Sequence, residues 1–280
     1  MNDQTGPKYL IGEDSFSIQY MSRTGFNSMP RPHEHSYYEL YYLLNGERVY
    51  FMNGNVYTAK KGDMIIINPH NLHSTASSEK PGFERILINF SEAFIKDGDS
   101  HIVKLLPFEQ SRLLRIPLKD QPEIEHLLKL MLAECKDEPP HYIAYVRSLM
   151  NELLIRIHRI GISVRESPEY EHPMHHKVSE IAQYINNHYD QKITLEQVAN
   201  QFYISPSYLS RIFTKLTGFH FREYLQVVRI REAQKRLVNS RESVQLIAEK
   251  VGFEHIAHFN KTFKKLAGTT PLRYRKQHKG

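Results

Sequence analysis

Residues 193–218 read ITLEQVANQFYISPSYLSRIFTKLTG, and residues 242–268 read ESVQLIAEKVGFEHIAHFNKTFKKLAG. The two stretches align with each other: Val198 matches Ile247, 49 residues further on, and after one insertion Leu209 matches Phe259, 50 residues further on. A sequence that recurs at a nearly fixed offset predicts a structural unit that occurs twice. The further matched pairs are Arg211 with Lys261, Phe213 with Phe263, and Gly218 with Gly268.

Each copy has the pattern of two short helices joined by a tight turn. Thr194 and Ser243 are residue types that cap helix N-termini, and Thr194 with Gln197 forms a capping-box pattern. Ser205-Pro206 supplies a cap and a proline at the first position of the next helix. We expect that helix to bury Leu209, Ile212, Phe213 and Leu216 in the first copy, and Phe259, Phe263 and Leu266 in the second. The sequence therefore predicts two helix-turn-helix units in tandem rather than a plain helical bundle.

The segment between the copies predicts one long helix over residues 220–238, HFREYLQVVRIREAQKRLV. At 1.5 Å per residue such a helix is roughly 28 Å long. Successive major-groove segments on one side of B-DNA lie about 34 Å apart. A rigid connector of this length can hold two recognition helices near that spacing, which predicts binding to duplex DNA. Basic side chains that could meet phosphates on this helix are Arg222, Arg229, Arg231, Lys235 and Arg236.

Charge is unevenly distributed along the chain. Residues 174–280 hold 18 Lys and Arg against 8 Asp and Glu, a net of +10, whereas the whole chain is +6, so residues 1–173 carry −4. A basic half beside a mildly acidic half is typical of a polyanion-binding module joined to a different domain.

The first half of the chain has the pattern of short antiparallel strands. Asn45-Gly46 and Asn53-Gly54 each lie between β-favouring runs, and Asn-Gly suits a type I′ turn. Gly62-Asp63 precedes the apolar run MIII, and RILINF at residues 85–90 predicts another strand. This spacing predicts a sandwich or small barrel.

Helical periodicity replaces the strand pattern after residue 120. Apolar stripes run along residues 122–136 and 141–160, and these two helices either pack on the β part as a hairpin or form a dimer surface. The polar stretch SVRESPEYEHPMHH, residues 163–176, predicts an interdomain linker. The expected fold is therefore α+β with two domains: residues 1–165, a linker at 166–176, and an all-α domain at 177–280.

Residues 33–46, HEHSYYELYYLLNG, place two histidines and a glutamate at alternate positions. On a strand, alternate side chains share a face, so His33, His35, Tyr37, Glu39 and Tyr41 are expected to point the same way. Imidazole and carboxylate groups on one wall suit a divalent transition metal. Three alternatives follow: a pocket for a small effector, a metal site, or residues that only pack or cap strands.

The C-terminal 100 or so residues resemble the AraC/XylS family of bacterial transcription regulators. The matching stretches are SPSYLSRIFTKLTG, the connector ending in RIREAQKRL, and IAEKVGFEHIAHFNKTFKKLAGTTPLRYR. The resemblance implies two recognition helices in adjacent major-groove segments and control of transcription near a promoter. It implies base contacts by Ser207, Ser210, Arg211, Ile256, Ala257, Asn260 and Lys261, and we expect phosphate contacts by Lys215, Lys264, Thr194 and Ser243.

The first half resembles the cupin-like sensor domain that many members of that family carry. HEHSYYELYYLLNG fits the cupin pattern of His-x-His, three residues, Glu, six residues, Gly. The second cupin motif, Gly62…Pro69…His73, is one residue short between proline and histidine, and His70 stands where glycine is usual. The resemblance implies a cupin-like barrel with an effector pocket of His33, His35, Tyr37, Glu39, Tyr41 and His73. In a metal cupin, His33, His35, Glu39 and His73 would hold a divalent metal, the one cofactor considered.

The function expected from these patterns is a transcription regulator, most simply an activator, controlled by a small effector such as a sugar. Expected partners are double-stranded DNA, the effector, RNA polymerase and a second copy of the chain, with no membrane. The single cysteine, Cys135, and the start MNDQTGPKYL, which lacks the features of a secretory signal, favour the bacterial cytoplasm, associated with the nucleoid. Two alternatives remain: a metal-dependent cupin enzyme fused to a DNA-binding module, and an architectural DNA-binding protein without an effector.

Overall fold

The chain divides into two compact units, Met1–His172 and Pro173–Gly280. The computed structural model describes residues 3–13, 15–29, 31–96, 111–163 and 172–278. Most of the stretch predicted to be a linker, residues 166–176, lies outside the described residues. Its end is helical, because helix α4 (Pro173–Asn187) begins at Pro173, and proline suits the first turn of a helix.

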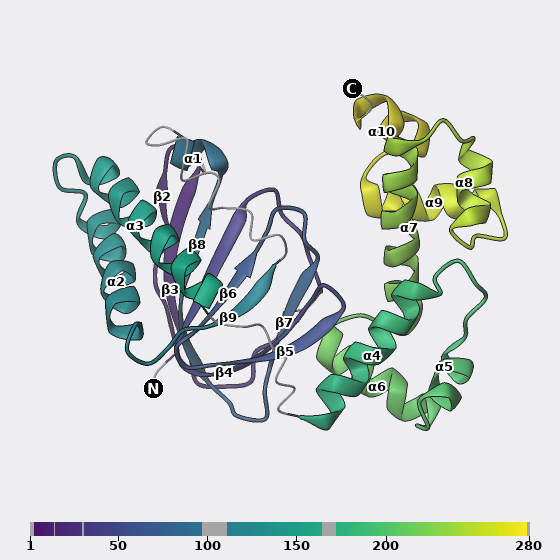
Figure 1. The fold of residues 1–280 in the computed structure, drawn as a ribbon, viewed down its shortest axis with the longest axis horizontal. Helices are drawn as coiled ribbons and strands as arrows, with labels where there is room; N and C mark the ends of the chain where they lie inside the picture. The colour runs from purple at the N-terminus through teal and green to yellow at the C-terminus, as the bar shows by residue number, and fades with distance from the viewer. Residues whose placement is uncertain (1–2, 14, 30, 97–110, 164–171, 279–280) are drawn as a thin grey trace. The chain divides into compact units, whose positions relative to one another are not determined.

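The first unit is built on an antiparallel sheet whose order is β1-β3-β8-β4-β6-β9, with β2 beside β3, and β5 and β7 beside β4. The long strand β4 pairs with β6 through its first half and with β5 and β7 through its second half, and Figure 1 shows the strands curving around an interior. The described strands are β1 (Gln4–Thr5), β2 (Tyr9–Ile11), β3 (Phe16–Arg23), β4 (Tyr38–Met52), β5 (Asn55–Lys60), β6 (Asp63–Ile67), β7 (His73–Ser77), β8 (Phe83–Phe90) and β9 (Arg112–Arg115). The predicted antiparallel β domain is confirmed.

The two Asn-Gly pairs behave differently. Asn53-Gly54 forms the predicted turn between β4 and β5, with φ values of 53° and 75°. The turn predicted at Asn45-Gly46 is wrong, because β4 continues through it and only its register with β8 shifts. Gly46 is needed there for another reason: it has φ 87°, and a Cβ atom would lie 2.5 Å from the carbonyl oxygen of Gly82. A bulge with a close backbone approach thus replaces the turn.

Helices cover one face of the sheet. The predicted helices are confirmed as α2 (Gln121–Asp137) and α3 (Tyr142–Ser163), and α1 (Glu92–Lys96) is short. α2 packs against α3, β2 and β3 (Figure 1). The stripe of α3 is buried within this single chain, so it is part of the core and is not available as the dimer surface considered above. Its buried members are Val146, Leu149, Met150, Leu153, Leu154 and Ile157.

A second, separate core fills the interior of the curved sheet. Along β4, Leu40 and Tyr42 pack toward the helices, whereas Tyr41 and Leu43 pack toward the interior. Glu39 alternates with Leu40 and therefore belongs to the interior face. This second face is where the predicted polar residues of the first unit are placed.

The second unit is all-helical, and the predicted tandem helix-turn-helix arrangement is confirmed. The first helix-turn-helix is α5–α6 and the second is α8–α9, and α7, a 19-residue helix, joins them (Figure 1). α7 packs against α4 and α6 as well as α8, α9 and α10. The bounds are α5 (Leu195–Gln201), α6 (Pro206–Thr217), α7 (Phe221–Asn239), α8 (Val244–Lys250), α9 (Ile256–Ala267) and α10 (Pro271–His278).

Burial in the two recognition helices follows the predicted stripes with two exceptions, Ile212, which is only half-buried, and Leu266. Leu209, Phe213, Phe259 and Phe263 are fully buried. The expectation that Leu266 is buried is wrong, because 42% of it is exposed, whereas the matching Leu216 is 6% exposed. Thr262, which is 6% exposed, takes an inward position on α9 instead. In the part of the chain that the structure describes, no helix is long and apolar enough to cross a bilayer.

Candidate functional site

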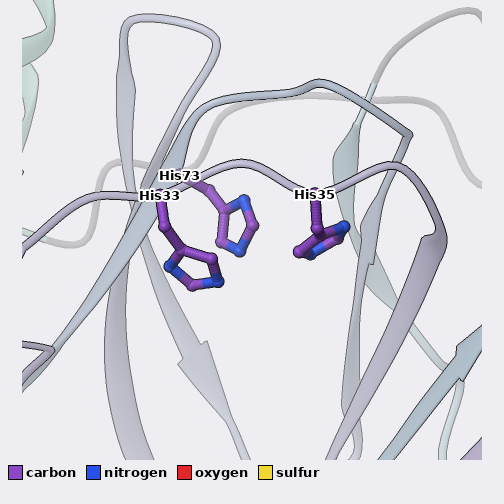
Figure 2. Close-up of side chains that lie close together, drawn as sticks. All are labelled: His33, His35 and His73. Atoms are coloured by element: carbon purple, nitrogen blue, oxygen red, sulfur yellow. The ribbon is translucent and has the colours of Figure 1, made fainter. Parts of the chain in front are cut away.

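The three predicted pocket histidines of the first unit lie together. His33 and His35 precede β4, and His73 is the first residue of β7. His33 and His73 form an isolated antiparallel bridge, with the N–H of each donating to the carbonyl oxygen of the other at 3.0 and 3.1 Å. Figure 2 shows the three rings gathered in one place. One ring nitrogen from each lies within 4.8 Å of the other two.

Backbone hydrogen bonds fix the protonation of two of these rings. Nδ1 of His35 lies 2.8 Å from the carbonyl oxygen of Tyr37, and Nδ1 of His73 lies 2.9 Å from that of Asn71. A carbonyl oxygen only accepts, so each Nδ1 carries the proton and, in the neutral ring, Nε2 keeps a lone pair. Both Nε2 atoms are buried: that of His73 has no hydrogen-bond partner among the described residues, and that of His35 faces the carboxylate of Glu39.

The carboxylate of Glu39 lies beside this group. Its Oε2 is 3.4 Å from Nε2 of His35, and Glu39 is 6% exposed. Burial alone would raise the pKa of Glu39, but the hydrogen bond from His35 and the charges of His73, His35 and Arg85 hold it below its usual value. Burial lowers the pKa of His33 and of His73, which favours neutral imidazoles. The arrangement thus combines neutral imidazoles at His33 and His73 with one ionised carboxylate.

The common face expected for residues 33–41 is present only in part, because β4 begins at Tyr38. Tyr37 stacks on His35, with ring centroids 4.0 Å apart and planes 5° apart. Tyr41 is buried in the interior, edge-on to Tyr50 at 5.3 Å, and burial raises its pKa to about 12. Tyr37 therefore orients His35, whereas Tyr41 lines the interior.

Strand β8 adds two interior polar residues that the sequence reasoning missed. Asn89 pairs with Glu39 in register, and its Oδ1 is buried without a hydrogen-bond partner among the described residues. Arg85 is 8% exposed, and its guanidinium lies 5.4 Å from the centre of the Tyr41 ring. The available signal was the alternation in FERILINF, in which Arg85 and Asn89 lie on the face opposite to that of Ile86, Ile88 and Phe90, which pack toward the helices.

The predicted DNA-contacting residues of the second unit lie on its two recognition helices. All are exposed except Ser210, which is half-buried: Ser207, Ser210 and Arg211 on α6, and Ile256, Ala257, Asn260 and Lys261 on α9. The guanidinium of Arg211 lies 5.5 Å from the ring centre of Tyr208. Lys215 and Lys264 are exposed further along the same helices. α6 and α9 therefore present polar and basic side chains outward over apolar inner faces.

Thr194 and Ser243 have a local structural role. The Thr194 hydroxyl accepts from the N–H of Gln197 at 3.2 Å, and the Ser243 hydroxyl accepts from the N–H of Leu246 at 3.1 Å. Each thus caps the first helix of its unit, as predicted.

The connector contains a residue whose role the sequence did not reveal. Arg229 is one of the connector's basic side chains, some of which could meet phosphates, but it donates to the carbonyl oxygens of Tyr189 at 2.7 Å and Gln191 at 2.9 Å. Gly252 leaves room for it, because a Cβ there would lie 2.8 Å from the guanidinium. Arg229 thus joins the loop after α4 to the turn of the second helix-turn-helix.

Comparisons with known families agree with this architecture. Residues 24–154 match the family described as the AraC-like ligand binding domain, and residues 198–277 match a helix-turn-helix domain family. The class of protein is therefore a DNA-binding transcription regulator with a ligand-binding domain. The chain belongs to the AraC/XylS family.

Two curated relatives are transcription regulators, and the similarity extends over most of their length. The Bacillus subtilis protein named uncharacterized HTH-type transcriptional regulator YfiF is 24% identical over 269 residues, which cover 95% of this chain and 85% of that protein. The HTH-type transcriptional activator RhaS of Klebsiella pneumoniae is 25% identical over 237 residues, 83% of each chain. The prediction that the chain is not an enzyme agrees with these relatives.

The solved structures that resemble part of this chain include isolated DNA-binding domains. The C-terminal domain of AraT from Geobacillus stearothermophilus is 33% identical, with a TM-score of 0.37, over 40% of this chain and 91% of that one. The DNA-binding domain of AdpA in complex with a target DNA is 27% identical, with a TM-score of 0.35, over 35% of this chain and 89% of that one.

Proposed function

We propose that this regulator is an activator whose two recognition helices enter adjacent major-groove segments, and whose first unit binds a small polar effector, a sugar being one candidate class. It acts as a homodimer, in contact with RNA polymerase, in the bacterial cytoplasm. The RhaS relatives are transcriptional activators, which supports activation rather than repression.

One observation carries the DNA-binding half of the proposal: the outward positions of α6 and α9 are exposed apart from the half-buried Ser210, while the inward Leu209, Phe213, Phe259 and Phe263 are fully buried. Side chains held on rigid helices can reach base edges without an ordering cost. Arg211 can donate two hydrogen bonds to a guanine, and Asn260 can pair with an adenine. Ile256 and Ala257 can contact thymine methyl groups. The proposed recognition surface therefore reads different bases in its two halves.

The interior of the first unit supports the effector half. Some buried polar atoms, such as Asn89 Oδ1 and His73 Nε2, have no hydrogen-bond partner among the residues that the structure describes, and they favour a polar ligand that would satisfy them. Arg85 supplies a cation on the same strand as Asn89. A hydroxylated molecule offers both donors and acceptors to such a wall. The ligand can control the output only through a difference in affinity between two states of the protein.

The experiment that tests the proposal is selection of binding sites from a random pool of duplex DNA by the intact chain. We expect an enriched motif with two conserved segments about one helical turn apart, one for each recognition helix. The double variant Arg211→Ala, Lys261→Ala should lose this enrichment while keeping salt-sensitive binding to unrelated DNA. Binding with a steep salt dependence and no enriched sequence would favour the architectural alternative and reject the proposal.

A further inference from the structure

We infer that His33, His35 and His73 form a binding centre for a divalent first-row transition metal ion, and that this ion is part of the signal the first unit detects. The binding centre rests on the histidine geometry alone. Its regulatory meaning rests on the proposed function, since it assigns a chemical class to the effector site.

The donor distances are close to those that a metal ion needs. Zinc–nitrogen bonds of 2.0–2.1 Å at tetrahedral angles place two nitrogen ligands roughly 3.3 Å apart. One nitrogen from each of His33, His35 and His73 lies within 4.8 Å of the others, so binding would have to draw these nitrogens somewhat closer together. The backbone bridge between His33 and His73 fixes the separation of two of the three ligands. The backbone therefore prepares the site.

The orientation of the rings is what metal ligation requires. Metal-binding histidines usually donate the second ring N–H to a carbonyl or carboxylate, which fixes the tautomer and aims the other nitrogen at the metal. His35 and His73 both do this through Nδ1, toward Tyr37 and Asn71. The Nε2 of His73 is fully buried with no hydrogen-bond partner in the described part of the chain. A buried lone pair of this kind calls for a cation or a donor.

The donor set selects the class of ion. Imidazole nitrogens suit Zn²⁺, Ni²⁺, Co²⁺, Fe²⁺ and Cu²⁺, whereas Ca²⁺ and Mg²⁺ prefer oxygen ligands. Glu39 contributes the negative charge, with Oε2 at 3.4 Å from His35 Nε2, either as a fourth ligand or beside the ion. Three nitrogen ligands leave a position open for an oxygen atom of a second ligand.

Binding would tie the segment before β4 to the first residue of β7. His33 and His35 come from that segment, and His73 begins β7, so a bound ion adds a third link to the two backbone hydrogen bonds of the His33–His73 bridge. An ion that binds one arrangement of this segment more tightly than another shifts the balance between them. The ion can thus act as the signal itself or as the holder of an organic effector.

The binding test uses the intact chain, stripped of metal with a strong chelator and titrated with Zn²⁺ in competition with a chromophoric chelator. We expect one tight equivalent per chain, and a loss of more than about tenfold in affinity for His33→Ala and for His35→Ala. The matched control is His126→Ala, which removes an exposed histidine of α2 and should bind as the wild type does. Co²⁺ in the same site should give the visible absorption of a nitrogen-ligated ion, and this absorption should be lost in His33→Ala.

Two results would overturn the assignment. One is a wild-type chain that binds no tight equivalent. The other is unchanged affinity in both His33→Ala and His35→Ala. Circular dichroism separates lost ligation from misfolding, and Glu39→Gln keeps the side-chain volume while removing the charge.

The regulatory part is tested separately with the selected DNA duplex. We expect Zn²⁺ to change the affinity of the wild-type chain for that duplex by severalfold, and to have no effect on His33→Ala, which should still bind DNA without metal. Equal DNA binding with and without Zn²⁺, despite tight metal binding, would reject the regulatory role. Loss of specific DNA binding in every form of the protein would instead reject the proposed function.

Discussion

The two helix-turn-helix units have helices of equal length, seven residues followed by twelve, yet these helices begin differently. α5 starts with a complete capping box of Thr194 and Gln197, whereas α8 has only the Ser243 cap. α6 starts with Ser205, whose hydroxyl accepts from the N–H of Tyr208, whereas α9 starts at His255 without a side-chain cap. The helices of the first helix-turn-helix are therefore better capped at their N-termini than those of the second.

Their outer surfaces differ as well, although their inner faces match. α6 presents Ser207 and Arg211, whereas α9 presents Ala257, Asn260 and Lys261 at comparable positions. The inner aromatic residues Phe213 and Phe263 are both fully buried. The comparison teaches that inward positions of the repeat carry the fold and outward positions carry the specificity, so the two can diverge independently.

The largest expected effect tests whether the two helix-turn-helix units fold together. Phe263 is 0% exposed and packs against Phe259 and Tyr274, each with ring centroids 5.6 Å away. Phe263→Ala should lower the free energy of unfolding by about 3–5 kcal/mol. Because α7 packs against both units and Arg229 bonds to the loop after α4, we expect the loss to reach α5 and α6. Amide hydrogen exchange of the intact chain, resolved by peptide, measures it.

The matched variants are Phe213→Ala, which removes the corresponding ring of the first unit, and Lys265→Ala, which changes an exposed side chain of α9. Phe213→Ala should reduce protection in both units, and Lys265→Ala should leave exchange unchanged. Protection lost only in α8 and α9 with Phe263→Ala would show that the units are independent, contrary to the expectation.

An intermediate effect tests the difference between the two recognition surfaces. Arg211→Ala should reduce discrimination at one base pair by about 1–3 kcal/mol, because a guanidinium can form two parallel hydrogen bonds with guanine. Lys261→Ala at the matching position should cost less discrimination, because an ammonium is a point charge without that fork. Anisotropy titrations with the selected duplex and its single-base variants measure both. Equal discrimination by wild type and Arg211→Ala would remove α6 from the assigned reading role.

Much of the fold was predictable because it depends on local chemistry. The repeat, the caps at Thr194 and Ser243, and the helical stripes specify the second unit from residues near one another in sequence. The absence of a turn at Asn45-Gly46 was not predictable, because the local conformation depends on Gly82, which is distant in sequence and approaches Gly46 closely. The prediction that Leu266 is buried was wrong for a similar reason: periodicity gives the direction of a side chain but not whether another element covers it.

The candidate site shows the same limit. The spacing of His33, His35 and Glu39 indicated a polar wall, and the structure brings His73 to it across a bridge that no local pattern specifies. The prediction that residues 33–41 share one face was wrong before Tyr38, because the chain there is not yet a regular strand. Asn89 was missed because its importance comes from pairing with Glu39, a partner 50 residues away.

The smallest expected effect tests the capping difference by repairing it. In α5 the Gln197 side chain accepts from the Thr194 N–H at 2.9 Å, and the matching position of α8 is Leu246, which is 39% exposed. Leu246→Gln would allow a capping box with Ser243, because the third helical residue can then reach back to the cap N–H. We expect the substitution to stabilise the second helix-turn-helix by about 0.3–0.5 kcal/mol, which would be seen as slower amide exchange in α8. Leu246→Ala, which removes the same apolar surface without adding an acceptor, is the control. If both variants exchange alike, the missing reciprocal hydrogen bond does not account for any difference in stability between the two units.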